Sequence, residues 1–500
     1  MKPTNVLKAR RMGINSQHEA LIFMHKDCPV CRAEGFSAHT RVRVRHGTRS
    51  IIATVYYVTN GLLALNQAGL SDVAWNSLEL MGDEDIAISH PRPLESFSRV
   101  RAKLYGNRLG QQSFHEIIDD IVAVRYSDIH LSSFLTACAA NELDTPEIVA
   151  LTHAMIDVGD RLQWDASPVM DKHCVGGLPG NRTTPIVVAI VAAYGLIIPK
   201  TSSRAITSPA GTADTMETMA PVDLDIHTMR KVVEREGGCI AWGGAMHLSP
   251  ADDILIRVER ALDLDTEDQL IASVLSKKIS AGATHIVLDI PVGPTAKVRT
   301  KQAADSLVSR FLEVSEVFGV QTEVVVTDGS QPIGRGIGPA LEARDVLSVL
   351  SCAQGAPRDL RERSILLAGA VLDLSGKEKD KGVLVATEIL ESGKAWDKFQ
   401  KICEAQGGMR EPPVAKYQHP FCALKPGVIG GIDNRNLAKI AKLAGAPDDK
   451  AAGLELLVHH GDTVEKEQPL FKIHAETPGE LNYALDYVQA NPDFIMMDVV

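Results

Sequence analysis

The residues best suited to chemistry lie in a glycine-rich stretch from Asp171 to Thr184, DKHCVGGLPGNRTT. Glycines let backbone N–H groups approach an anion, and Lys172 supplies a full positive charge. The apolar run from Pro185 to Ala193 follows directly and is a predicted helix, whose N-terminus adds a favourable dipole. The stretch therefore predicts an anion site, although its spacing fits neither a Walker A loop nor a dinucleotide fingerprint. A turn that packs a helix onto a sheet is the alternative.

A second stretch, Thr201 to Asp214 (TSSRAITSPAGTAD), combines hydroxyl groups, one arginine and small residues. Hydroxyl donors and a guanidinium suit phosphate or sugar, because both ligands present several acceptors in a small volume. A polar loop with a helix cap would explain this stretch alone. Two such stretches close together in the chain favour the binding of a ligand.

The length and composition of the chain limit the kinds of protein that could contain these stretches. The chain has 500 residues, more than one hydrophobic core usually supports, so several domains are expected. With 45% hydrophobic and 23% charged residues it has the composition of a globular protein without a membrane span. Its net charge of -11 argues against a general nucleic-acid surface. The basic N-terminus lacks a following apolar core and cleavage site, so a cytoplasmic protein is predicted.

The eight cysteines are dispersed, which indicates reduced thiols more than a disulfide framework. Cys28 and Cys31 form the only CxxC pair. A zinc or redox role would need further ligands or a thioredoxin-like context, so a local turn is the preferred interpretation.

The periodicity along the chain predicts four parts. Residues 1–89 alternate apolar and polar positions, as in a small β-rich domain. Helical periodicity begins at Leu94, where Ser113 and Glu116 have the spacing of a capping box. Between Pro168 and Gly408, apolar β-branched runs at 186–193, 285–290 and 322–326 alternate with helices, which indicates an α/β sheet unit. A final α+β unit follows Pro412 and Pro413.

The stretches DKHCVGG (171–177), SRAITSPAGTAD (203–214), LIASVLSKK (270–278) and VGP (292–294) together resemble the thymidine phosphorylase family. The resemblance extends from about Leu94 to the C-terminus. With its additional N-terminal domain, the chain is similar to the long branch of that family, which contains bacterial chains assigned as thymidine phosphorylases and archaeal AMP phosphorylases.

The resemblance implies an α/β multidomain fold in which an all-α domain faces a large α/β domain across a cleft, with a C-terminal α+β domain and an extra β-rich N-terminal domain. Closure of such a cleft would bring the reactants together and exclude water. The expected domains are residues 1–89, the helical domain at 94–164 with about 250–279, the phosphate-binding α/β domain at 165–249 and 280–410, and the C-terminal domain at 411–500.

The resemblance also implies roles for single residues. Lys172, Thr184 and Thr212 would hold phosphate, with backbone donors from Gly176 and Gly177. His173 would lie near the base as a proton donor, or would orient the loop instead. Ser273 and Lys277 match positions that hydrogen-bond a pyrimidine, and their i, i+4 spacing puts both on one helical face.

The sequence departs from the thymidine enzymes at two places. The arginine expected before Ser273 has no clear equivalent in Arg257-Val258-Glu259-Arg260, and Cys174 replaces a serine that contacts phosphate. A thiol donates weakly, so backbone donors must compensate or phosphate binds more loosely. Agreement with AMP phosphorylases is closer, and Lys297 could neutralise a 5′-phosphate. The positions that match nucleotide-binding residues of that subgroup are Gly177, Ser203, Arg204, Ala205, Ile206, Thr207, Ser208, Thr212, Asp265, Ser273 and Lys297, with Asp265 as proton donor.

Three functions follow as hypotheses. The first is phosphorolysis of thymidine to thymine and 2-deoxy-α-D-ribose 1-phosphate. The second is an AMP or nucleoside-monophosphate phosphorylase that releases the base and ribose 1,5-bisphosphate. The third is a non-catalytic nucleotide- or phosphate-binding relative. Phosphate is a co-substrate, no metal or organic cofactor is expected, and the partners would be a nucleoside or nucleotide and phosphate in a homodimer or larger homo-oligomer, without a nucleic-acid polymer or membrane.

Overall fold

The computed structural model describes residues 5–205, 208–264 and 266–498. The chain divides into two compact units, one of Met1–Ala102 with Asp119–Ser133 and one of Lys103–Ile118 with Phe134–Val500. Helices α3 (Phe97–Leu104), α4 (Gln111–Val122) and α5 (Asp128–Ala140) contribute residues to both units. None of the helices in the described residues combines the length and the apolar character that a membrane span requires.

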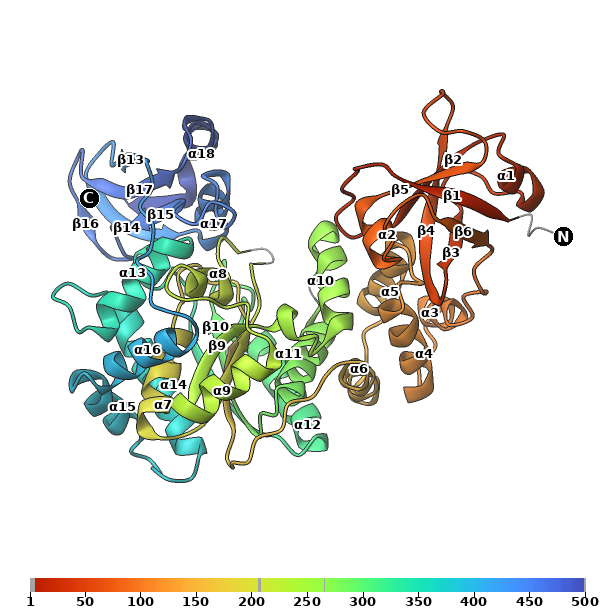
Figure 1. The fold of residues 1–500 in the computed structure, drawn as a ribbon. Helices are drawn as coiled ribbons and strands as arrows, with labels where there is room; N and C mark the ends of the chain where they lie inside the picture. The colour runs from red at the N-terminus through yellow and green to blue at the C-terminus, as the bar shows by residue number, and fades with distance from the viewer. Residues whose placement is uncertain (1–4, 206–207, 265, 499–500) are drawn as a thin grey trace. The chain divides into compact units, whose positions relative to one another are not determined.

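The first unit contains a closed β-barrel, drawn in red and orange in Figure 1. Its elements are β1 (Val6–Arg11), β2 (Leu21–His25), α1 (Pro29–Glu34), β3 (Arg41–His46), β4 (Arg49–Val58), β5 (Gln67–Leu70), α2 (Asp72–Ser77) and β6 (Asp85–Ser89). The strands close in the order β1-β5-β2-β4-β3-β6. In β3, Val42 and Val44 are buried in the barrel core, and Arg41, Arg43 and Arg45 face outward because successive side chains alternate. The predicted β-rich fold of residues 1–89 is confirmed.

Cys28 and Cys31 lie at the start of α1, where the Cys28 sulfur accepts a hydrogen bond from the Cys31 N–H at 3.2 Å. Both side chains are buried in the barrel core. No group of three His, Cys, Asp or Glu side chains in the described part of the chain is arranged to hold a metal ion. The pair therefore forms a helix-capping turn.

The second unit is built around parallel strands. They are β7 (Met170–Cys174), β8 (Ile198–Ser202), β9 (Gly238–Trp242), β10 (His285–Val292) and β11 (Gln321–Asp328). β7 pairs with β10 and β10 with β11, β8 pairs with β9, and a parallel bridge from Val169 to Ile197 joins the two groups. The predicted α/β sheet is confirmed.

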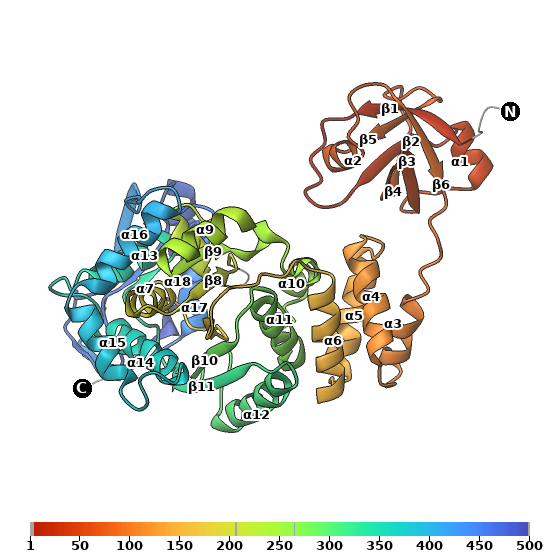
Figure 2. The same cartoon turned by 60° about the horizontal axis from the view of Figure 1, so that its bottom comes forward.

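Helices cover both sides of this sheet, with α7 and α14 on one side and α12 on the other (Figure 2). The helices are α7 (Thr184–Tyr194), α8 (Thr212–Glu217), α9 (Ile226–Glu236), α12 (Lys301–Val317), α13 (Pro339–Leu350), α14 (Arg358–Leu374), α15 (Gly382–Glu391) and α16 (Lys394–Ala405). The apolar run at 185–193 is a helix, as predicted, and not a strand like the runs at 285–290 and 322–326. Pro185 opens it and Gly195 ends it with a positive φ. Its branched side chains are buried and contribute roughly 2 kcal/mol each.

A group of helices lies beside the sheet. It comprises α6 (Thr145–Asp157), α10 (Pro250–Leu262) and α11 (Glu267–Ser280). α11 packs against α6, which supports the proposed grouping of residues 250–279 with the earlier helices. The predicted capping box is wrong, because α4 begins at Gln111 and the Ser113 N–H already bonds the Gly110 carbonyl within the first turn.

The C-terminal part is the expected α+β unit, with its own core. Its elements are β12 (Gly336–Ile337), β13 (Tyr417–Cys422), β14 (Gly427–Ile432), α17 (Asn434–Leu443), β15 (Gly453–Leu456), β16 (Thr463–Val464), β17 (Pro469–Ala475), α18 (Pro478–Ala490) and β18 (Ile495–Asp498). The strands form two sheets, β12-β15-β17-β13 and β16-β14-β18. β12 belongs to the chain segment between β11 and α13, so this unit is joined to the α/β part by a strand pair.

Candidate active site

The candidate segments follow the ends of neighbouring parallel strands. Residues 175–183 follow β7, residues 203–211 follow β8, and residues 293–297 follow β10. The carboxyl ends of parallel strands meet at one edge of a sheet, which is where ligands bind in open α/β folds. The fold therefore brings three separate stretches of sequence to one edge.

The glycine-rich loop needs its glycines for two reasons. Gly176 and Gly177 have φ values of 90° and 78°, which favour glycine over other residues. A Cβ on Gly177 would also lie 2.5 Å from the backbone nitrogen of Lys297. The loop after β7 is thus packed directly against the segment after β10, and Lys297 borders the predicted anion site.

Lys172 is buried in the middle of β7, and its ammonium group lies beside the start of α7. Its Nζ donates to the Thr183 hydroxyl at 2.8 Å and lies 3.7 Å from an Asp289 carboxylate oxygen. Asp289 in turn accepts hydrogen bonds from Thr327 and Asn181, at 2.7 and 3.1 Å. A buried charge is tolerated when it is paired, so this network fixes the ammonium group next to the helix N-terminus. Thr184, the first residue of that helix, is buried beside it.

A second buried network adjoins Lys172. Asp171 lies between two lysine ammonium groups, 3.3 Å from Lys200 Nζ and 3.2 Å from Lys278 Nζ. Both lysines also donate to the Thr201 carbonyl. Burial lowers the pKa of Lys200 well below its usual value, although Asp171 opposes this shift. The base of the site therefore combines several buried lysines with the carboxylates that pair with them.

His173 is half-buried and surrounded by these cations. Burial lowers its pKa well below 6.5, and the charges of Lys278, Lys200, Lys277 and Lys172 lower it further. The imidazole is therefore neutral at neutral pH. It can donate or accept a hydrogen bond, but an imidazolium is strongly disfavoured until a negative charge arrives.

The thiol of Cys174 is neutral as well. Burial, with the nearby Asp289, raises its pKa to about 12. Its sulfur accepts a hydrogen bond from the Asn181 amide at 3.4 Å. A neutral thiol is a poor nucleophile.

Arg182 links the glycine-rich loop after β7 to the segment after β8. Its Nη1 donates to the Thr212 hydroxyl and its Nη2 to the Ala210 carbonyl, both at 2.8 Å. Its Nε donates to Glu342 at 2.6 Å. Glu342 is buried, and burial raises its pKa while Arg182 lowers it. Thr212, at the start of α8, is thus held close to the glycine-rich loop that follows β7.

Carboxylates surround Arg204 in the second segment. Its guanidinium bonds Glu217 at 2.8 and 2.9 Å and lies 4.8 Å from the Trp242 ring centre. The hydrogen bond with Glu217 raises the pKa of Arg204 and lowers that of Glu217 to about 2. Asp214 accepts the N–H groups of Ala205 and Gly211, at 2.6 and 3.0 Å. In this arrangement Arg204 stabilises the loop, and a direct contact with nucleotide stays a prediction.

The other predicted residues of this segment differ in exposure. Ser203 is exposed, and its carbonyl accepts the Ala213 N–H at 3.3 Å. Ser208 is half-buried, and its hydroxyl donates to the Ala210 carbonyl at 2.9 Å. The predicted residues Ile206, Thr207 and Asp265 lie outside the described residues.

Ser273 and Lys277 lie side by side on α11. The Lys277 Nζ donates to the Ser273 hydroxyl at 3.0 Å and to Asp252 of α10 at 2.7 Å. The next residue, Lys278, reaches Asp171 on β7. The end of α11 is therefore fixed to the strand that contains Lys172 and His173.

The networks contain several residues that the sequence did not single out: Asp171, Asn181, Arg182, Lys200, Lys278, Asp289 and Glu342. Asp171, Asn181 and Arg182 lie inside the glycine-rich stretch, and Lys278 lies within LIASVLSKK, so a closer reading of those motifs could have included them. Lys200, Asp289 and Glu342 lie outside every motif and have no such signal.

Comparison with known sequence families defines the class of protein. The glycosyl transferase family a/b domain matches residues 166–396, and the helical bundle domain of that family matches residues 99–159. The pyrimidine nucleoside phosphorylase C-terminal domain matches residues 428–494. The chain therefore belongs to the glycosyl transferase family.

More specifically, the chain belongs to the pyrimidine nucleoside phosphorylase family. Relatives from Chelativorans sp. (strain BNC1) and Legionella pneumophila (strain Corby) carry the name "Putative thymidine phosphorylase". Both are 58% identical to this chain, covering 98% and 99% of it and 97% and 96% of their own lengths. A crystal structure of anthranilate phosphoribosyltransferase from Thermus thermophilus shares the fold, with a TM-score of 0.53 and 21% identity over 61% of this chain and 98% of that one.

Proposed function

We propose that this enzyme is a thymidine phosphorylase, which uses inorganic phosphate to release thymine from thymidine and forms 2-deoxy-α-D-ribose 1-phosphate. One observation carries the proposal. The helix that presents Ser273 and Lys277 is joined through Lys278 and Asp171 to the strand that holds Lys172. The names of the full-length relatives point to the same substrate.

In this mechanism phosphate binds beside Lys172, the N–H groups of Gly176 and Gly177, and the hydroxyls of Thr184 and Thr212. The phosphate attacks the anomeric carbon as the bond to the base lengthens, and positive charge develops on the sugar. A bound dianion stabilises that charge. It is already positioned, which is worth on the order of 7 kcal/mol.

The leaving base requires a proton or a hydrogen bond. His173 is neutral in the free enzyme because burial and four lysines lower its pKa. A bound phosphate dianion would oppose this effect, since a nearby negative charge favours the imidazolium. Protonation of His173 would then accompany phosphate binding and would accelerate departure of the base on the order of 100-fold. Asp265, outside the described residues, is the second candidate donor.

Phosphorolysis of thymidine, uridine, AMP, CMP and UMP, each with and without phosphate, tests the proposal. Thymine should appear from thymidine only when phosphate is present, and Lys172→Gln should raise the KM for phosphate about tenfold or more. The matched control is Lys466→Gln, an exposed lysine remote from the candidate segments in the sequence. Failure to release any base contradicts the function.

Nucleoside-monophosphate phosphorolysis is the second candidate, and it has its own support. The close contact between Gly177 and Lys297 brings this lysine next to the glycine-rich loop, where it could neutralise a 5′-phosphate. Base release from AMP, CMP or UMP but not from thymidine would favour this function. Lys297→Ala should then abolish the preference for the 5′-phosphate.

A further inference from the structure

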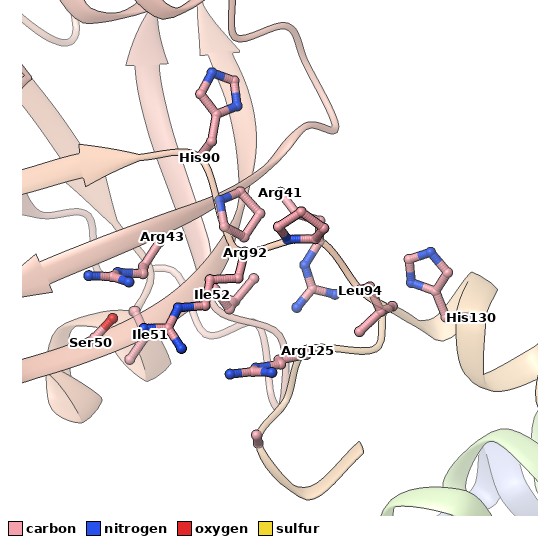
Figure 3. A pocket seen from close by; sticks show the side chains of 13 residues that line it. Arg41, Arg43, Ser50, Ile51, Ile52, His90, Arg92, Leu94, Arg125 and His130 are labelled. Atoms are coloured by element: carbon pink, nitrogen blue, oxygen red, sulfur yellow. The ribbon is translucent and has the colours of Figure 1, made fainter. Parts of the chain in front are cut away.

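The first unit contains a cavity lined by arginines, far along the sequence from the candidate active site. Its volume is about 610 Å³, and its lining includes Arg41 and Arg43 of β3, Arg92 of the linker after β6, and Arg125 after α4. Figure 3 shows these four side chains around one opening. Within residues 5–205, 208–264 and 266–498, no Asp or Glu is among the side chains that line it.

The hydrogen bonding of these arginines is incomplete. Arg41 donates through Nη2 to the Val124 carbonyl at 2.8 Å, but its Nε is buried without a hydrogen-bond partner. The Nε of Arg43 is likewise buried without a hydrogen-bond partner. A buried donor without an acceptor is unfavourable, so the cavity lacks acceptors that an anionic ligand would supply.

The surrounding charges leave the cavity cationic. Arg125 is paired with Asp120 at 2.7 Å, so its charge is already compensated. His130 has a pKa lowered by burial and by Arg41, which keeps its ring neutral. Burial lowers the pKa of Arg41, whereas Glu19 and Asp128 raise it and so partly offset its charge. Arg43, separated from Arg41 by one residue on the outward face of β3, and Arg92 provide the remaining positive charge.

Apart from Ser50, His90 and His130, the rest of the lining is apolar. Ile52 of β4 lies opposite Arg43 of β3 and forms one wall, Leu94 lies beside the arginines (Figure 3), and the adjacent Ile51 packs toward the barrel core. The volume lies within the range of small-molecule sites, which combine apolar walls with a few placed polar groups. Guanidinium groups bind phosphate oxygens in pairs, and an isoleucine or leucine wall suits the flat face of a base.

We propose that this cavity binds a nucleoside polyphosphate, with its phosphates on the arginines and its base against the isoleucine wall. A bare polyanion would leave the apolar wall uncovered. A nucleic-acid strand would be repelled electrostatically by the chain as a whole, since its net charge is -11. A small nucleotide uses both halves of the lining, and the site would be additional to the one proposed for phosphorolysis.

Calorimetric titration with ATP, tripolyphosphate and adenosine tests the proposal, with saturating phosphate and thymine present to occupy the candidate active site. ATP should bind more tightly than tripolyphosphate, and adenosine should bind weakly. The double variant R43E/R92E should weaken ATP binding about tenfold or more. R45E is the matched control, since Arg45 is exposed on the same strand and does not line the cavity, and it should change the affinity less than about twofold.

Photo-crosslinking with 8-azido-ATP locates the bound nucleotide. Peptides from residues 41–52, 90–94 or 123–130 should be labelled, and R43E/R92E should remove the label while phosphorolysis continues. If R43E/R92E fails to fold, R92E alone serves, because Arg92 is exposed. Labelling confined to residues 172–212, equal affinities for ATP and tripolyphosphate, or absence of ATP binding would each overturn the proposal.

Discussion

The ammonium group of Lys278 lies 3.2 Å from an Asp171 carboxylate oxygen, which fixes the end of α11 to strand β7. The same Asp171 pairs with Lys200 on β8. Three elements thus meet at one buried carboxylate. The position of Ser273 and Lys277 relative to Lys172 depends on this contact.

Replacement of Lys278 by Met should destabilise the protein and weaken catalysis. It removes one of two cations from a buried carboxylate, and breaking such a pair costs about 3 kcal/mol. Urea unfolding measures the loss, and Lys466→Met, on an exposed turn, should change the free energy of unfolding by less than about 0.5 kcal/mol. If Lys278→Met were as stable and active as the parent, the pair would have no positioning role.

A double-mutant cycle should reveal strong coupling between Arg182 and Glu342. Arg182→Met leaves the Glu342 carboxylate buried without its main partner, at a cost of about 3 kcal/mol. Adding Glu342→Leu should restore much of that stability, because no isolated charge remains. It should not restore the KM for phosphate, since Thr212 has still lost the donor that orients it. Additive changes in unfolding free energy would argue against coupling.

His173 should make stability depend on pH below about 6.5. Its folded-state pKa is well below the usual 6.5, so below that pH the unfolded chain binds more protons than the folded chain. Stability should therefore fall as the pH falls, by up to about 1.4 kcal/mol per pH unit. His173→Asn should reduce this slope in unfolding measured between pH 5 and 7.5. His419→Asn, an exposed control, should keep it.

Cys174 should resist alkylation. Its pKa of about 12 leaves almost no thiolate at pH 8, whereas Cys352 is exposed. Treatment with iodoacetamide should label Cys352 and leave phosphorolysis intact, as mass spectrometry and an assay of the same sample can determine. Cys352→Ser should lose that label. Rapid labelling of Cys174 together with loss of activity would contradict a neutral, unreactive thiol.

Local patterns in the sequence were enough to identify the glycine-rich loop and its neighbours. Gly176 and Gly177 adopt the positive φ values that only glycine tolerates well, and the i, i+4 spacing of Ser273 and Lys277 produces a direct hydrogen bond. These features depend on residues a few positions apart, which periodicity and turn chemistry describe.

The partners that hold the site could not be predicted in the same way. Arg182 and Glu342 are 160 positions apart, and Asn181 and Asp289 are 108 positions apart. Only the tertiary packing of distant helices, loops and strands makes them neighbours. The type of element formed by the apolar run at 186–193 is hard to assign from its pattern alone, because a fully buried helix contains the same branched residues as a buried strand.

The division of the candidate site among three strand ends has an evolutionary consequence. The connection after β7 contains Lys172's glycine-rich loop, and the connection after β8 contains the polar stretch at 203–211. Each can change in length or composition while the strands beneath keep their pairing. Exchange of the β8 connection between relatives should therefore change which pentose-containing substrate is preferred without rebuilding the glycine-rich loop, so one scaffold can serve several substrates.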